Sequence, residues 1–250
     1  MKIDTFIINN ELHTLELRLQ ILNEVMDHFI IVESTVEHSG RTKPLYFNDN
    51  KQHFDNWKDK ITHIIVEDTP NSGNDRWIRE NFQRNAILRG LENFKHQDLV
   101  FMSDIDEIPD PDAVKNNKIG GYRQVYSMYY INTICTTENW VGTTALRCSE
   151  YRRLSPQTIR NNRYNLPNIV PGGWHFAYMM SIEQIHHKLG AFAHSEYDTP
   201  QVHSTIQQKI DNLNDLFGAH IKPLDVIDIT TGYFPEYLKN NLEKYTNYIK

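Results

Sequence analysis

The sequence of 250 residues lacks several features that would assign it to common classes of protein. It has no long basic run and a formal net charge of -6, which argues against a nucleic-acid groove and against an anionic membrane surface. No window approaches the roughly 20 apolar residues that span a bilayer, and Met1 runs directly into the strand-like KIDTFII without a signal peptide. Two cysteines, Cys135 and Cys148, are too few for a disulfide framework, and no N-x-S/T sequon occurs. We therefore expect a soluble, unexported protein in a reducing, cytoplasmic setting.

The order of hydrophobic runs predicts the fold class. A chain with 39% hydrophobic residues at this length can bury a large core, and we expect one domain over residues 1–250. The first 110 residues alternate β-rich runs with helical patterns, which is typical of βαβ units. The runs are IDTFII, HFIIVE, THIIVE and DLVFMSD. The prediction is an α/β fold with a Rossmann-like, mostly parallel central sheet flanked by helices.

The C-terminal half is expected to elaborate this sheet. After Pro111 the sequence changes to the aromatic strands GYRQVYSMYYINTI and WVGTTALRC, followed by the glycine turn PGGWHFAYM. Helix-like segments follow near 182–190, 204–217 and 235–249.

Polar residues are expected to gather where the strands end. Between the third and fourth runs, NDRWIRENFQRNAILRGLENF starts after the plausible N-caps Asn74 and Asp75 and is polar in its first half. In a βαβ unit this half lies at the carboxyl edge of the sheet, where ligands of open α/β sheets bind. Arg79, Arg84 and Asn85 are therefore predicted to lie near a site. The stretch STVEHSGRTKPLYFNDNKQ is interpreted as a long functional loop.

The fourth run ends in five carboxylates within nine residues, from Asp104 to Asp112. Side chains alternate across a strand, so Asp104 and Asp106 can share one face, and one cation, while Ile105 points into the core. Oxygen ligands at this spacing suit Mg²⁺ or Mn²⁺, which complete their coordination with water and substrate phosphates. The alternatives are a solvated acidic turn and a structural calcium loop.

Acids also follow two other runs. Glu33, after HFIIV, is predicted to accept hydrogen bonds from a ribose or a base, as acids at the end of a second strand do in nucleotide-binding sheets. The alternative is that each acid is a strand-end residue that faces water. For Glu33 the two interpretations have equal weight, and for Glu67 the solvated one is favoured.

Several stretches taken together resemble glycosyltransferase family 17, whose best known members are β-1,4-mannosyl-glycoprotein β-1,4-N-acetylglucosaminyltransferases. They are NNELHTLELRL, FIIVESTVEHSGRTKPLYF, RWIRENFQRN, SDIDEIP, GGWHFAYM with SIEQIHHKL, and FPEYLKNN. The resemblance implies a GT-A-type fold, a UDP-sugar donor such as UDP-N-acetylglucosamine, a glycan or other hydroxyl acceptor, a Mn²⁺ or Mg²⁺ cofactor, and inversion at the anomeric carbon. It also divides the domain into a nucleotide-sugar-binding half, residues 1–112, and an acceptor-binding half, residues 113–250.

The resemblance also implies roles for single residues. Asp104 and Asp106 fall on the family's metal and diphosphate motif, and the third metal ligand is open between His175 and His194. The residues it assigns to the donor are Asn10, Glu11, Glu33, Arg84, Asp104, Glu107 and Lys188.

Sugar transfer also needs a carboxylate to accept the proton of the acceptor hydroxyl. The candidate acids are Glu183, Glu196, Asp198 and Glu138. Glu183 is preferred because it begins a helix after a glycine turn and matches the family, although a helix-start glutamate also serves as a dipole partner. Aromatic residues that could be acceptor platforms or core are Tyr126, Tyr129, Tyr130, Trp140 and Trp174.

Two other functions use the same features. A metal-dependent phosphotransferase or nucleotide-sugar hydrolase would also place a cation at an acidic strand end. A carbohydrate-binding module would use the aromatic strands, with structural calcium in the acidic turn.

Overall fold

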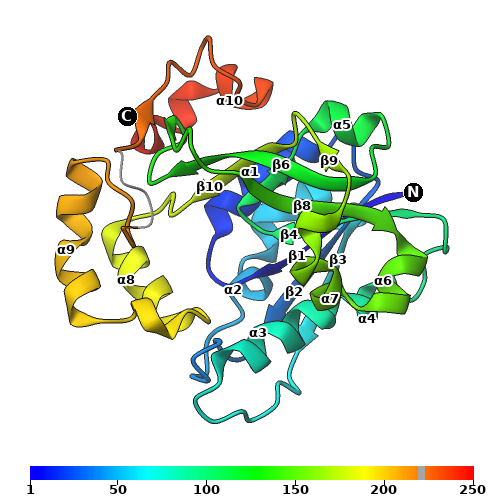
Figure 1. Cartoon of the computed structure of the whole chain (residues 1–250). Helices are drawn as coiled ribbons and strands as arrows, with labels where there is room; N and C mark the ends of the chain where they lie inside the picture. Colours follow the sequence, from blue (N-terminus) through cyan, green and yellow to red (C-terminus); the bar gives the residue numbers. More distant parts are fainter. Residues whose placement is uncertain (219–222) are drawn as a thin grey trace.

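The computed structural model describes residues 1–218 and 223–250, and Figure 1 shows their arrangement. The strands are β1 (Lys2–Ile8), β2 (His28–Ser34), β3 (Ile61–Val66), β4 (Leu99–Asp104), β5 (Glu107–Pro109), β6 (Gly120–Met128), β7 (Thr133–Ile134), β8 (Trp140–Arg147), β9 (Asn168–Ile169), β10 (Gly173–Ala177) and β11 (Asp225–Val226). The α-helices are α1 (Leu12–Leu22), α2 (Tyr46–Asp49), α3 (Arg76–Asn85), α4 (Ile87–Leu91), α5 (Pro111–Lys115), α6 (Cys148–Leu154), α7 (Pro156–Asn161), α8 (Ile182–Ala191), α9 (Pro200–Asp211) and α10 (Glu236–Lys239). The 3-10 helices are η1 (Lys51–Lys60), η2 (Arg163–Asn165), η3 (Ser195–Tyr197), η4 (Leu242–Lys244) and η5 (Thr246–Tyr248).

The strands join into one sheet, whose main path runs β11-β7-β6-β8-β4-β1-β2-β3. β1 pairs in parallel with β2 and β4, and β2 pairs in parallel with β3, as the first four hydrophobic runs predict. β8 is antiparallel to both β4 and β6, so the C-terminal half of the sheet is mixed. The register places Ile7 beside Asp104 and Ile8 beside Glu33. The carboxyl ends of β1, β2 and β4 therefore meet at one edge.

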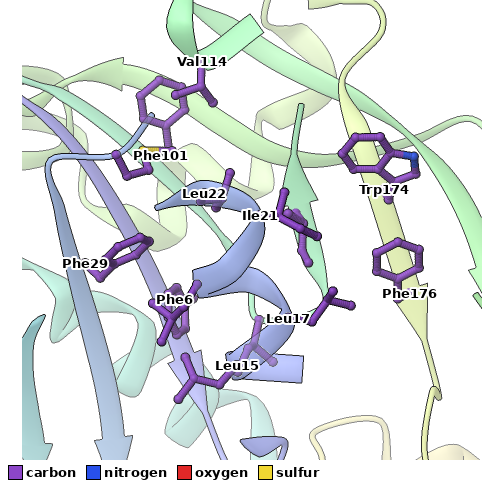
Figure 2. Close-up of a cluster of buried hydrophobic side chains, with 14 of the residues drawn as sticks. Phe6, Leu15, Leu17, Ile21, Leu22, Phe29, Phe101, Val114, Trp174 and Phe176 are labelled. Carbon is purple, nitrogen blue, oxygen red and sulfur yellow. The ribbon is translucent and has the colours of Figure 1, made fainter. Parts of the chain in front are cut away.

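Side chains of the central strands alternate between two hydrophobic clusters, one on each face of the sheet. Figure 2 shows part of the first cluster, in which Phe6, Phe29 and Phe101 pack with Leu15 and Leu22 of α1. The second cluster covers the opposite face with side chains from α3, α4, α6 and α7. Helices thus flank both faces, which confirms the predicted α/β class.

A third cluster packs α8 and α9 against each other, through Ile185 and Leu189 of α8 and Ile206 and Ile210 of α9. α8 agrees with its predicted range, whereas α9 begins before residue 204 because Thr199 caps the helix and accepts from the backbone N–H of Val202. Within the described residues, no helix combines the length and apolar character needed to cross a bilayer.

The predicted helix near 235–249 is broken into three short pieces. α10 ends at Lys239, and the backbone at Asn241 (φ -140°, ψ 37°) leaves the helical region before η4 begins. The apolar side chains of this segment still pack on the first cluster, through Leu238 and Tyr245. The spacing of these apolar residues predicts one continuous helix, but the helical backbone is interrupted at Asn241.

Candidate functional site

A cavity of about 660 Å³ opens at the carboxyl edge of β1, β2 and β4. Its walls come from the loop after β2, α3, the turn between β4 and β5, the segment around α7, and α8. Its carboxylates, among the described residues, are Glu11, Glu37, Glu80, Asp104, Asp106, Glu107, Glu138 and Asp215. Its basic side chains, apart from histidine, are Lys43, Arg84, Arg160, Arg163 and Lys188. Eight acids against five bases leave a formal excess of three negative charges when the histidines are neutral.

α3, which forms the polar first half of the segment predicted between the third and fourth runs, faces this cavity as that pattern predicts. Asp75 caps the helix by accepting from the backbone N–H groups of Trp77 and Ile78. Arg84 lines the cavity one turn before the apolar half of the segment begins. Arg79 instead supports the loop after β2 by donating to the carbonyl of His38 at 2.9 Å.

Two arginines from distant parts of the sequence hold the carboxylate of Asp104. Oδ1 accepts from Arg84 Nη2 at 2.8 Å, and Oδ2 accepts from Arg160 Nη2 at 2.8 Å. Burial would raise the pKa of Asp104, but the charges of Arg160 and Arg84 outweigh it and hold the pKa well below its ordinary value. Asp104 is therefore ionised and ties α3 to α7.

Asp106 has looser partners. Its Oδ1 lies 3.6 Å from His175 Nε2, and its Oδ2 lies 3.4 Å from Lys188 Nζ. Burial would raise the pKa of Asp106, but Lys188 and His175 lower it well below the ordinary value. Burial would in turn lower the pKa of Lys188, and Asp106 and Glu11 raise it above its ordinary value. Lys188 is thus a cation that pairs directly with Asp106 at the wall of the cavity.

The donor atoms of the turn fit a hard divalent cation at Asp106 and His175. Cis ligands at about 2.1 Å from Mg²⁺ lie about 3 Å apart, so a gap of 3.6 Å between Asp106 Oδ1 and His175 Nε2 needs little closure. Each oxygen of Asp104 keeps a second lone pair beside its arginine, and 31% of this side chain is exposed. In residues 1–218 and 223–250, no group of three or more His, Cys, Asp or Glu side chains is placed to hold a metal ion. Water and substrate oxygens would have to supply the other ligands.

His175, rather than His194, lies beside the acidic turn. β10 pairs antiparallel with β5, which places His175 opposite Glu107. His175 Nδ1 is buried without a hydrogen-bond partner among the described residues. His194 lines the outer cavity, where its Nδ1 lies 2.7 Å from Glu196 Oε1 and its ring meets the edge of Trp77.

Glu107 is fully buried and positions its neighbours. Its carboxylate accepts two hydrogen bonds from Arg160, at 2.7 and 2.8 Å, and one from Trp140 Nε1 at 2.8 Å. It also accepts from the backbone N–H of Asp104 at 2.8 Å. Sequence reasoning missed Arg160. Ser155 and Pro156 signal the start of α7, but the pattern does not indicate which of its side chains turns inward.

The other residues predicted to bind the donor divide into two groups. Glu11 lines the cavity, with Oε1 3.6 Å from Lys188 Nζ, and beside it Asn9 rather than Asn10 lines the wall. Glu33 lies outside the cavity lining, because its fully buried carboxylate accepts from the backbone N–H groups of Phe47 and Asn48 at 2.9 and 3.3 Å. These bonds anchor the loop after β2.

The loop after β2, predicted to be functional from its length, lies at the wall of the cavity. Val36, Glu37, His38 and Lys43 line the cavity between α3 and α8. Burial lowers the pKa of Lys43, partly offset by Glu33, 3.7 Å away. Glu67, at the end of β3, is exposed, in agreement with its solvated alternative.

The four candidate bases occupy different surroundings. Glu183 lies exposed on the first turn of α8, and Glu196 is exposed in η3; neither is among the described residues that line the cavity. Asp198 pairs with Arg76 and His203 outside the lining. Glu138, before β8, does line it and is half-buried. A further acid missed in the sequence, Asp215, also lines the cavity and is 2% exposed.

Other side chains pack against two of the predicted aromatic platforms, Trp140 and Trp174. Arg163 lies over the ring of Trp140 at 5.4 Å, and His175 lies 4.7 Å from the same ring. Trp174 is buried and stacks on Tyr233 outside the cavity lining. Trp77, not singled out in the sequence, lines the cavity and is 41% exposed.

Comparison with known proteins gives a match to one family model, Glycosyltransferase family 17, over residues 2–225. Over 114 residues the chain is 29% identical to the rat β-1,4-mannosyl-glycoprotein 4-β-N-acetylglucosaminyltransferase, which covers 43% of this chain and 21% of that protein. The human enzyme of the same name gives 28% identity over 114 residues, with the same coverage. The aligned region thus spans about a fifth of the length of these relatives.

Solved structures give weaker likenesses. A Francisella tularensis 2-C-methyl-D-erythritol 4-phosphate cytidylyltransferase matches at a TM-score of 0.37 and 12% identity, covering 75% of this chain and 98% of that one. The galactosyltransferase LgtC, solved with donor and acceptor sugar analogues, matches at a TM-score of 0.33 and 11% identity, covering 98% and 94%.

Proposed function

Because the chain belongs to glycosyltransferase family 17, we propose that it transfers a sugar from a nucleotide-sugar donor to a hydroxyl group of a glycan or similar acceptor. One observation supports this most strongly. Asp104 ends the buried strand β4, Asp106 follows in the turn, and both line the same cavity as Arg84, Arg160 and Lys188. We further propose UDP-N-acetylglucosamine as donor, since the relatives above are named N-acetylglucosaminyltransferases, and inversion at the anomeric carbon as the resemblance implies.

The charge of the cavity supports dependence on a divalent cation. A diphosphate brings roughly two more negative charges into a space that already holds three in excess, so binding needs an added cation. We propose Asp106 and His175 as its protein ligands, with Asp104 beside them, water and substrate oxygens completing the coordination, and Mn²⁺ or Mg²⁺ as the ion. When bound, the ion would neutralise the charge that gathers on the leaving diphosphate.

The chain's own residues would hold the donor in place. Lys188 is kept protonated by Asp106 and Glu11, so it can donate to a diphosphate oxygen. Arg84 and Arg160 are fixed by Asp104 and present guanidinium groups at the same wall. These cationic groups would stabilise the negative charge of a bound diphosphate.

For the acceptor we propose Glu138 as the general base. Of the four acids predicted from the sequence, it is the one that lines the cavity among the described residues. Asp215 is 2% exposed, whereas Glu138 is only half-buried and is therefore the more accessible of the two acids. Glu138 would accept the acceptor proton as the oxygen attacks the anomeric carbon.

Thermal and urea unfolding with UDP and Mn²⁺ tests the donor site. At 100 times its dissociation constant, a ligand should stabilise the fold by about 2.7 kcal/mol. Asp106→Asn should abolish that gain, while the matched control Asp112→Asn, an exposed acid of the same segment, should keep it.

Other results would favour the alternative functions. Stabilisation by Ca²⁺ and free sugars, with no response to UDP, would favour a binding module. A mass-spectrometric screen of nucleotide sugars then names the transferred group. Wild-type protein that neither binds nor cleaves any of them would overturn the proposal.

A further inference from the structure

Arg18, on α1, lies directly behind the acidic turn. Its side chain and that of Asp4 on β1 are both fully buried. Arg18 Nε and Nη2 donate to the two carboxylate oxygens of Asp4 at 2.7 and 2.6 Å, and Nη2 also donates to Ser103 Oγ at 2.7 Å. Leu17 and Leu22 on the same helix belong to the first hydrophobic cluster (Figure 2). A neutral ion pair thus sits in the core at the end of β4.

The remaining nitrogen of Arg18 binds the backbone of the turn. Nη1 donates to the carbonyl oxygens of Asp104 at 3.1 Å, Ile105 at 3.1 Å and Glu107 at 2.9 Å. The carbonyl of Asp106 accepts from the backbone N–H of Phe176 at 2.9 Å. Every carbonyl from 104 to 107 therefore has a partner within the protein. The turn is held from behind, and its side chains line the cavity.

Stability alone does not explain this arrangement. Desolvation of two buried charges offsets their attraction, and an apolar pair of similar size often serves a core equally well. An apolar pair could not, however, donate to the three carbonyl groups. Arg18 can donate to them because its planar fork carries five N–H groups, and the two on Nη1 serve the three carbonyls, with one N–H shared between two of them.

We propose that Arg18, held by Asp4, is a positioning residue that fixes the turn so that Asp104 and Asp106 present their carboxylates to the cation and the donor diphosphate. The identity of these ligands rests on the proposed function, whereas the fixing of the turn does not. Because Asp4 neutralises Arg18, its effect on the turn is geometric rather than electrostatic.

The test replaces the pair by apolar side chains in the double variant Asp4→Leu, Arg18→Met. We expect the apolar pair to fill the core but the thermal midpoint to fall, since three carbonyl groups and Ser103 lose their donor. The dissociation constant of Mn²⁺ alone, measured by electron paramagnetic resonance, should rise about 10- to 100-fold, the usual effect of removing a group that orients metal ligands. Hydrogen exchange at the amides of residues 103–108 should become faster.

A matched control is Arg152→Met. Arg152 also donates to three backbone carbonyls, those of Leu91, Glu92 and Phe94, but away from the cavity. This variant should unfold at a lower temperature and bind Mn²⁺ within about twofold of wild type. If it weakened Mn²⁺ binding as strongly as the double variant, general loosening would explain both and the proposal would fail.

A second variant covers the case in which the double variant does not fold. Arg18→Lys keeps the charge beside Asp4 but has three N–H donors instead of five, so it cannot serve all its partners. It should fold and show faster exchange at residues 103–108 with weaker Mn²⁺ binding. Wild-type exchange and affinity in a folded Arg18→Lys variant would overturn the proposal. Wild-type protein that binds neither Mn²⁺ nor UDP would contradict the proposed function, and the exchange rates alone would then decide the role of Arg18.

Discussion

The acidic turn between β4 and β5 and the exposed acids Glu183 and Glu196 both supplied carboxylates to the predicted site. In the turn, Asp104 pairs with Arg84, 20 residues away, and with Arg160, 56 residues away, and buried Glu107 also pairs with Arg160. Of the exposed acids, Glu196 pairs with His194 two residues away, at the surface. The difference teaches that partners brought together by the fold mark a candidate site better than charge density does, since pairs of near neighbours form on almost any solvated segment.

The largest expected effect comes from removing one of the long-range partners. Arg160→Met leaves Glu107 buried without the two bonds that Arg160 donates, and frees Asp104 on one side. Breaking a buried pair in this way costs about 3–5 kcal/mol, so urea unfolding should show that loss together with weaker UDP binding. Arg153→Met, which removes a surface partner of Glu150, is the control and should cost about 0–1 kcal/mol. Equal costs for the two variants would remove the contrast between buried long-range pairs and exposed pairs of near neighbours.

A smaller effect is expected from substituting the two candidate general bases, Glu138 and Glu183. Glu138→Gln should lower kcat about 100-fold with donor affinity unchanged, because it removes the proposed base without touching the diphosphate site. Glu183→Gln, on the exposed turn of α8, should change kcat by less than about twofold. Both are measured as transfer or hydrolysis of UDP-sugar at saturating donor. The reverse ranking would restore Glu183 as the base and place function at the exposed acids.

The smallest effect is a dependence on pH. The folded-state pKa of Asp104 lies below its ordinary value of 3.8, so its contribution to stability is complete above 3.8 and is lost as the pH falls toward the folded value. The difference in unfolding free energy between wild type and Asp104→Asn should be constant near neutral pH. Below about pH 3.8 it should shrink by about 1.4 kcal/mol per pH unit. Urea titrations down to about pH 3 check this, and a difference that stays constant throughout would contradict the pairing of Asp104 with two arginines.

Local patterns were sufficient for the sheet and for part of the site. Continuous hydrophobic runs predict β1 to β4, and the position of the acids at the end of the fourth run leads to Asp104 and Asp106. The roles of Glu33 and Glu183 could not be read in the same way, because the sequence does not show that one carboxylate turns inward to backbone N–H groups and the other outward to solvent. Nor does it show that Arg18 and Arg160 are buried, since arginines on helices are usually solvated.

The link that Asp104 makes between α3 and α7 has a consequence for how this protein tolerates change. Active-site groups often reduce stability, so that variants which lose activity become more robust. Here the carboxylate of Asp104, which faces the cavity, also links α3 to α7 through its ion pairs with Arg84 and Arg160. If laboratory evolution relaxes selection on catalysis, substitutions at position 104 should therefore not stabilise the protein. Inactive variants with a substitution at this position should give a poor yield of folded protein.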